Sequence, residues 1–161
     1  DLQYVEAVAV MTAIGVVDGD TAGNFNPTNG LTRGAAAKII CNMLLGPTTA
    51  EALAANSAPF SDVAPDHVFA GYIAYGAKEG IVNGYSDGTF APDGNITRAE
   101  VVTVVNRATG RMADDEYISK NSSILNKFTD LNNNHWAYED AMEAANDHKA
   151  ITSADSENWV K

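Results

Sequence analysis

Residues 80–84 read Gly-Ile-Val-Asn-Gly and echo residues 15–19, which read Gly-Val-Val-Asp-Gly. The same offset of 65 residues relates Ile-Thr-Arg at 96–98 to Leu-Thr-Arg at 31–33. Between these anchors, a Gly-x-Phe-x-Pro pattern also recurs at that offset. A fixed period over several anchors indicates duplicated structural units, and such units usually bury a core by packing on one another.

The unit at 60–110 is the best preserved and predicts the local structure. It opens with Phe-Ser-Asp-Val at 60–63. Apolar or small residues at four-residue spacing then predict a helix from about 67 to 79, which Gly80 would end as a left-handed C-cap. Residues 83–95 are dense in turn formers and predict a compact, ordered loop.

The same order of elements divides the chain into three repeats. We expect repeat 1 at 1–46, repeat 2 at 60–110 and repeat 3 at 128–161, separated by connectors at 47–59 and 111–127. Repeat 1 lacks the opening Phe-Ser-Asp-Val, which predicts truncation at its start. Repeat 3 opens with Phe-Thr-Asp-Leu but contains no Thr-Arg-Ala-Glu, so it is expected to be incomplete or divergent. Together the repeats are expected to form one structural unit.

The acidic composition narrows the classes of partner. The chain has 161 residues, a formal charge of −11 and a pI of about 4.4. Such a charge disfavours nucleic acid and anionic membranes as partners. No apolar run has the length of a membrane span, so membrane insertion is not expected. The single cysteine, Cys41, lies in a small and apolar run and is expected to be a buried hydrophobe.

Catalytic and metal-binding motifs are not found in the sequence. The three histidines (His67, His135 and His148) are not part of any recognised hydrolase, metalloprotease or P-loop motif. No Cys/His cluster has zinc spacing, and a calcium loop counted from Asp18 or Asp20 has no acidic ligand at its twelfth position. We therefore expect that the chain is not an enzyme and that it has no cofactor and no metal site.

Two arginines raise a question of charge. Thr97 and Glu100 match a capping box, and Thr32 keeps the cap without the glutamate. Arg98 and Arg33 then occupy the first helical position, where the helix dipole disfavours a cation by roughly 0.3–1 kcal/mol. A bound anion would reverse that sign, since N–H groups and a guanidinium would converge on it. A salt bridge to an acidic residue of a neighbouring repeat explains the arginines equally well.

The motifs at 60–63, 80–92 and 96–100, with His-Trp-Ala at 135–137, resemble the S-layer homology (SLH) repeat. The resemblance implies a mainly helical fold in which three repeats form a pseudo-threefold, three-pronged spindle around a central helical bundle. It implies a module that holds exported proteins on the bacterial cell wall by binding secondary cell-wall polysaccharide, in many cases a pyruvylated amino sugar, in grooves between repeats. Carried onto this chain, Arg98 and Arg33 would meet the ketal carboxylate, which favours the anion over the salt bridge.

Further groove positions follow from the same resemblance. Thr97 and Thr32 flank the arginines, and the ligand set extends over the loop and the helix starts to Gly84, Tyr85, Asp87, Gly88, Asp62 and Trp136. The glycines would let the backbone approach the sugar, and the aromatic rings could stack on it. Turn roles for the two aspartates, and burial of Trp136 in the core, are the alternatives.

Departures from the repeat pattern predict unequal grooves. Repeat 1 has Gly34 and Ala35 where the motif has Ala and Glu, and repeat 3 has no motif arginine. We expect at most two competent grooves, with the one containing Arg98 the better. The competing class is a structural module that self-associates within a surface layer through protein contacts. Both interpretations place the chain outside the cell, at the bacterial cell wall or surface layer.

Overall fold

The computed structural model describes residues 4–20, 22–53, 59–153 and 156–160. The chain divides into two compact units, unit 1 up to Ile96 and unit 2 from Thr97 onward. This boundary falls inside the repeat expected at 60–110, directly before the Thr-Arg-Ala-Glu motif. Among the described residues, no helix combines the length and apolar character needed to cross a bilayer.

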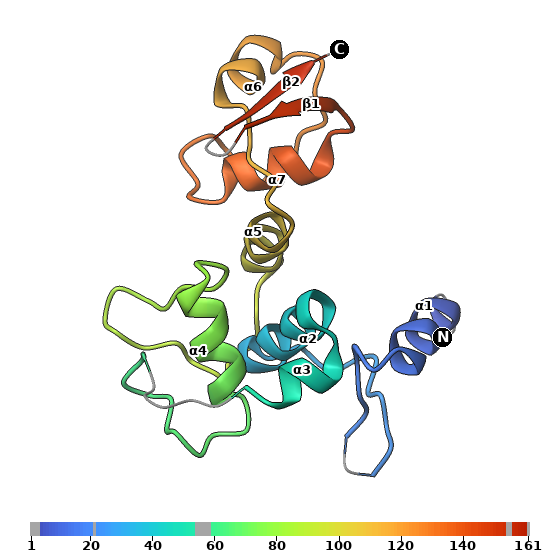
Figure 1. The fold of residues 1–161 in the computed structure, drawn as a ribbon. Helices are drawn as coiled ribbons and strands as arrows, with labels where there is room; N and C mark the ends of the chain where they lie inside the picture. The colour runs from blue at the N-terminus through green and yellow to red at the C-terminus, as the bar shows by residue number, and fades with distance from the viewer. Residues whose placement is uncertain (1–3, 21, 54–58, 154–155, 161) are drawn as a thin grey trace. The chain divides into compact units, whose positions relative to one another are not determined.

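Helices dominate the described chain, as the resemblance to the repeat implies (Figure 1). The elements of unit 1 are α1 (Val5–Ala13), α2 (Arg33–Leu45), α3 (Pro47–Glu51) and α4 (Ala70–Lys78). Those of unit 2 are α5 (Arg98–Thr109), α6 (Asp115–Asn121), α7 (Tyr138–Ala145), β1 (Lys149–Thr152) and β2 (Glu157–Val160).

The 65-residue period is visible in the backbone of unit 1. Left-handed backbone conformations recur at that spacing in three pairs: Gly15 and Gly80, Gly23 and Gly88, and Asn26 and Ala91. Because residues other than glycine rarely adopt positive φ, the pair of Asn26 and Ala91 is the stronger sign of a shared backbone conformation. The two loops that precede α2 and α5 therefore share a backbone design as well as a sequence pattern.

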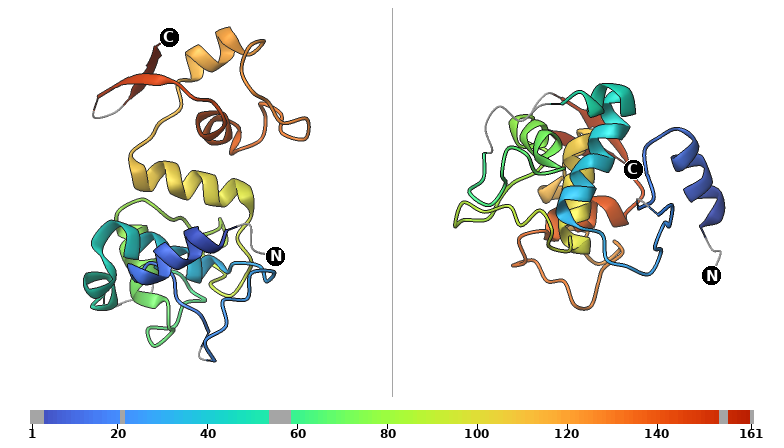
Figure 2. Two further views of the ribbon diagram at one scale, coloured as in Figure 1. Left: turned by 90° about the vertical axis from the view of Figure 1, so that its right-hand side faces the viewer. Right: turned by 90° about the horizontal axis from the view of Figure 1, so that it is seen from below.

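Each unit pairs the second helix of one repeat with the first helix of the next. In unit 1, α2 packs against α4, and Cys41 and Ile73 are almost completely buried. A Cβ at Gly34 would overlap the Phe69 ring, which explains why repeat 1 has glycine where the motif has alanine. In unit 2, α5 packs against α7, and Figure 2 shows both helices from two further sides.

The helix starts were predicted correctly where a capping motif marks them. The Thr97 hydroxyl accepts from the Glu100 N–H, and the Glu100 carboxylate accepts from the Thr97 N–H, so the capping box of α5 is complete. The Thr32 hydroxyl caps α2 in the same way without the reciprocal contact. In contrast, α4 begins at Ala70, later than the predicted position 67.

The end of repeat 3 forms an antiparallel hairpin that was not predicted. Lys149 pairs with Val160 and Thr152 with Glu157. The β1 side chains are exposed, while β2 alternates buried and exposed residues. Trp159 of β2 packs with Ile118 and Met142 in a small core that joins the hairpin to α6 and α7. The hairpin takes the place of the turn-rich loop that follows the first helix in repeat 2.

Candidate functional site

Arg33 opens α2, and its side chain is buried inside unit 1, with only 7% of the residue exposed. Its Nε donates to the Phe90 carbonyl at 2.7 Å, and a terminal nitrogen donates to the Asn83 carbonyl at 2.9 Å. The guanidinium carbon lies 4.7 Å from the centre of the Tyr85 ring and 4.6 Å from that of Phe90. Arg33 therefore joins repeat 1 to the loop of repeat 2 through backbone acceptors and aromatic rings, and not through the anion or the acidic side chain that the sequence suggested.

The N-terminus of α2 is also occupied by the protein itself. The Arg33 N–H donates to the Gly94 carbonyl at 2.8 Å, and the Gly34 N–H donates to the Pro92 carbonyl at 2.8 Å. The Thr32 hydroxyl accepts a third N–H at 3.2 Å. An external anion at this helix end would have to displace carbonyl acceptors of repeat 2. The helix-terminus chemistry that motivated an anion site is already satisfied at α2.

Asp62 and Asp87 make turn contacts, the role given above as the alternative to binding sugar hydroxyls. The two oxygens of Asp62 accept from the N–H groups of Phe90 and Ala91 at 2.8 and 2.7 Å. Burial alone would raise the pKa of Asp62, but these N–H donors hold it below its usual value. Asp87 accepts from both the N–H and the hydroxyl of Thr89, at 3.0 and 2.6 Å. Both carboxylates thus fasten the loop backbone.

The glycines and tyrosine of this loop have distinct surroundings. A Cβ at Gly84 would overlap the Phe60 ring and the Thr89 carbonyl, so the missing side chain permits packing within the protein. Gly88 has φ of 84° and open space around it, so its requirement is the left-handed backbone. Tyr85 is 46% exposed and lies over Arg33, which leaves part of its ring accessible.

Arg98, in contrast, is exposed and lines a pocket of about 650 Å³ in unit 2. One wall comes from α5, another from the Phe-Thr-Asp-Leu segment and His135, and the third from α7. The lining residues are Arg98, Ala99, Val102, Phe128, Asp130, Leu131, His135, Ala137, Ala141, Ala144 and Ala145. The pocket therefore combines a cation, an acid and a histidine with a mostly apolar floor.

The polar groups at the start of α5 are available to a ligand. Within the described part of the chain, the Arg98 guanidinium makes no hydrogen bond or ion pair, and neither do the N–H groups of Arg98 and Ala99. The acceptors that hold Arg33 belong to the loop at 83–92, and repeat 3 has a hairpin in place of that loop. The divergence of repeat 3 is thus the physical reason why the two arginines differ.

The structure brings some predicted site residues together and separates others. Thr97 and Arg98 lie at one end of α5, but Thr97 is engaged in the capping box. Burial of Trp136 in the core, the alternative given above, was wrong, because the residue is 62% exposed and stacks on His135; its role as a ligand residue stays a prediction. Phe128 and Asp130 were missed as pocket residues, although their segment was recognised as the counterpart of residues 60–63.

Comparison with known proteins identifies the repeats. The S-layer homology domain matches residues 2–37 and 59–102. The chain is 40% identical to "Cell surface glycoprotein 1" of Acetivibrio thermocellus over 121 residues. The aligned segment covers 73% of this chain and 5% of that protein. It is 34% identical to a "Cellulosome-anchoring protein" of the same organism, over 74% of this chain and 26% of the relative.

A third relative is the "Surface-layer 125 kDa protein" of Lysinibacillus sphaericus, 36% identical over 62% of this chain and 8% of that protein. The chain thus spans about a quarter or less of the length of these relatives. Their names and the matched domain indicate a location at the cell surface. The chain belongs to the S-layer homology domain family.

Proposed function

We propose that this chain is a non-catalytic anchoring module that binds an anionic wall polysaccharide through the pocket at Arg98. Anchoring at the surface is supported by the matched domain and by a relative named as an anchoring protein. The ligand is a secondary cell-wall polysaccharide whose amino sugar carries a pyruvate ketal. Its carboxylate would accept from the Arg98 guanidinium and from the first N–H groups of α5.

The contrast between the two motif arginines carries this proposal. Arg33 has carbonyl acceptors for its Nε and for a terminal nitrogen, whereas the Arg98 guanidinium has no acceptor in the described chain and faces a pocket. A pocket of about 650 Å³ is within the range that holds a small ligand such as a disaccharide. His135 and Asp130 supply further polar groups for sugar hydroxyls, and Phe128 supplies an apolar face.

Arg33 has a supporting role in the proposal. By holding the loop at 83–92, it keeps Tyr85 in place at the surface of unit 1. The three-repeat spindle implied by the resemblance belongs to the same proposal. It is supported by the recurring packing of a second helix on the next first helix, α2 on α4 and α5 on α7.

A sedimentation assay with purified cell walls tests the proposed function. Walls that retain their polysaccharide should bind the chain, and walls stripped of it should not. Arg98→Ala should lose most of the binding because it removes the carboxylate partner. Arg107→Ala is the matched control, since it removes the same charge from the last turn of the same helix.

The assay also separates the competing class. Equal binding to stripped and intact walls would reject a polysaccharide ligand. An apparent molar mass, measured by light scattering, that rises with protein concentration in the absence of glycan would instead favour self-association within a surface layer.

A further inference from the structure

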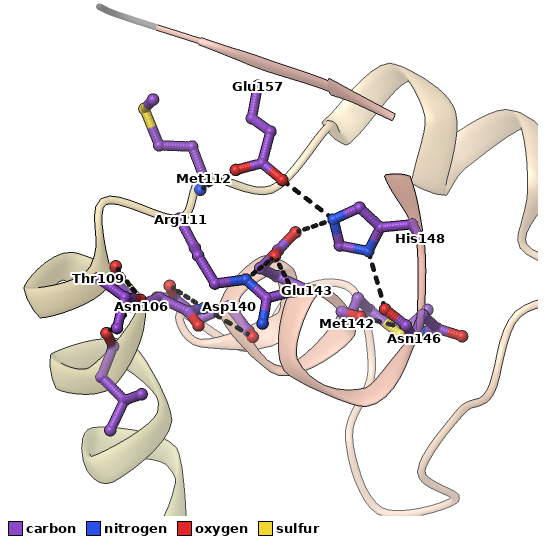
Figure 3. A network of polar contacts seen from close by, with 11 residues as sticks. Asn106, Thr109, Arg111, Met112, Asp140, Met142, Glu143, Asn146, His148 and Glu157 are labelled. Atoms are coloured by element: carbon purple, nitrogen blue, oxygen red, sulfur yellow. Dashed lines mark hydrogen bonds and ion pairs between the residues drawn. The ribbon is translucent and has the colours of Figure 1, made fainter. Parts of the chain in front are cut away.

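Three ionisable side chains meet in the interior of unit 2, away from the pocket at Arg98. Glu143 comes from α7, His148 from the turn before β1, and Glu157 from β2. Glu143 is completely buried, and 7% of each of the other two side chains is exposed. Figure 3 shows the His148 ring pointing one nitrogen at both carboxylates and the other at the backbone of Asn146.

The hydrogen bonds determine the state of the imidazole. Nδ1 of His148 lies 2.8 Å from the Asn146 carbonyl, which can only accept, so Nδ1 carries a hydrogen. Nε2 lies 3.0 Å from a Glu157 oxygen and 3.4 Å from Glu143 Oε2. A bare Nε2 lone pair would face two carboxylate oxygens in a buried site, which is unfavourable. A proton between Nε2 and the carboxylates, or a metal ion, is therefore needed at that point.

The separations suit a metal ion. Ligand atoms about 2.0–2.1 Å from a tetrahedral Zn²⁺ lie roughly 3.3 Å from one another. The two measured separations are 3.0 and 3.4 Å, and all three ligand atoms lie within 4.8 Å of one another. Glu143 Oε2 is buried and accepts no hydrogen bond from the residues that the structure describes, so a metal would provide a partner for it.

The surroundings hold the ligands in place. Arg111 contacts the other oxygen of Glu143, Oε1, through its Nε at 2.7 Å and a terminal nitrogen at 2.6 Å. The Asn146 carbonyl orients the imidazole, which is the usual outer partner of a metal-bound histidine. The ring of Trp159 stacks on His148 with centroids 3.9 Å apart. Two carboxylates also neutralise a divalent ion, and the charge of Arg111 is partly exposed to water.

We propose that Glu143, His148 and Glu157 form a binding site for Zn²⁺, with a water molecule as the fourth ligand. The ion would tie the hairpin to α7, whose Ala141, Ala144 and Ala145 form one wall of the Arg98 pocket. The expectation of no metal site rested on Cys/His spacing and calcium loops. These ligands escape both patterns because two are carboxylates and they come from three elements.

Titration of the full 161-residue chain with Co²⁺ tests the site, since four-coordinate Co²⁺ has an intense visible absorption that exposed carboxylates do not produce. We expect uptake of a single equivalent with that absorption, and its loss on addition of Zn²⁺. His148→Gln and Glu157→Gln should each weaken binding by about tenfold or more. His67→Gln is the control, because His67 lies in unit 1 and outside the cluster, and Co²⁺ binding by this variant should equal that of the native chain.

Two results would overturn the proposal. The first is a native chain that takes up no Co²⁺ or Zn²⁺, which would assign the central cation to a proton on His148. The second is uptake that both His148→Gln and Glu157→Gln retain at the native affinity, which would assign the ion to other ligands of the protein. Should His148→Gln fail to fold by far-UV circular dichroism, Glu157→Gln and the native titration still decide the question.

Discussion

Replacing Arg33 with alanine should destabilise unit 1 strongly, whereas the same change at Arg98 should not affect stability. The Arg33 guanidinium donates charged hydrogen bonds of 2.7 and 2.9 Å to the carbonyls of Phe90 and Asn83. Hydrogen bonds to charged groups contribute about 1.5–3 kcal/mol each, and Phe90 is almost completely buried, so its carbonyl would lose its partner. We expect a loss of about 3–5 kcal/mol, a large part of the stability of a typical domain.

Urea unfolding followed by far-UV circular dichroism measures this loss. The midpoint of Arg33→Ala should fall with little change in slope, because the surface exposed on unfolding hardly changes. The midpoint of Arg33→Lys should lie between those of the native chain and Arg33→Ala, since an ammonium keeps the charge but lacks the planar fork that reaches both carbonyls. Arg98→Ala, at an exposed site, should stay within about 0.5 kcal/mol of the native chain. Equal losses for the two alanine variants would refute the distinction between a structural and a ligand-facing arginine.

Three further predictions concern unit 1. Burial raises the pKa of the Cys41 thiol to about 11, so it should react with a disulfide reagent at pH 8 only after unfolding in urea; rapid labelling of the native chain would contradict its burial. The N–H of Asn24 and the side chain of Asn26 are the main causes that lower the pKa of Asp20 to about 2. Because the pKa of Asp20 is lower in the folded chain, its ionised carboxylate stabilises the loop at any pH above the ordinary carboxyl pKa. That stabilisation is lost as the pH falls through the folded pKa. The NMR shifts of the loop amides should therefore change between about pH 4 and pH 2, and Asp20→Asn should abolish that change. Gly88→Ala should cost about 1–2 kcal/mol in urea unfolding because φ is 84°, while Gly88→Asn should cost less; the reverse order would argue against a backbone cause.

Local signals in the sequence predicted local structure well. Thr97 and Glu100 identified the capping box, since both partners lie within one turn and their chemistry needs no tertiary contact. Gly80 was correctly predicted in the left-handed conformation. Burial of Cys41 also followed from its apolar surroundings in the chain.

Tertiary partners could not be predicted in the same way. The acceptors of Arg33 are backbone carbonyls of Asn83 and Phe90, and any residue type supplies such groups. A cation at a helix start can be compensated by neutral carbonyls and aromatic rings as well as by anions, and at Arg33 the carbonyls and rings do so. A role as a core anchor was the alternative for Trp136, yet it stacks on His135 at the surface.

The hairpin of repeat 3 shows a further limit. Its first strand is exposed throughout, so no alternation of apolar and polar residues marks it. Only Trp159 anchors the second strand in the core. The cluster of Glu143, His148 and Glu157 depends on this hairpin, and so it could not be seen before the fold was known.

The central claim is that Arg98 binds the carboxylate of a wall sugar, and a thermodynamic cycle between the two groups tests it most directly. Calorimetry would measure the affinity of the native chain and of Arg98→Ala for wall polysaccharide with and without its pyruvate ketal. We predict that removing the ketal costs the native chain about 1.5–3 kcal/mol and costs Arg98→Ala almost nothing, because the two groups act on each other. Equal losses in both proteins would place the carboxylate elsewhere and contradict the account.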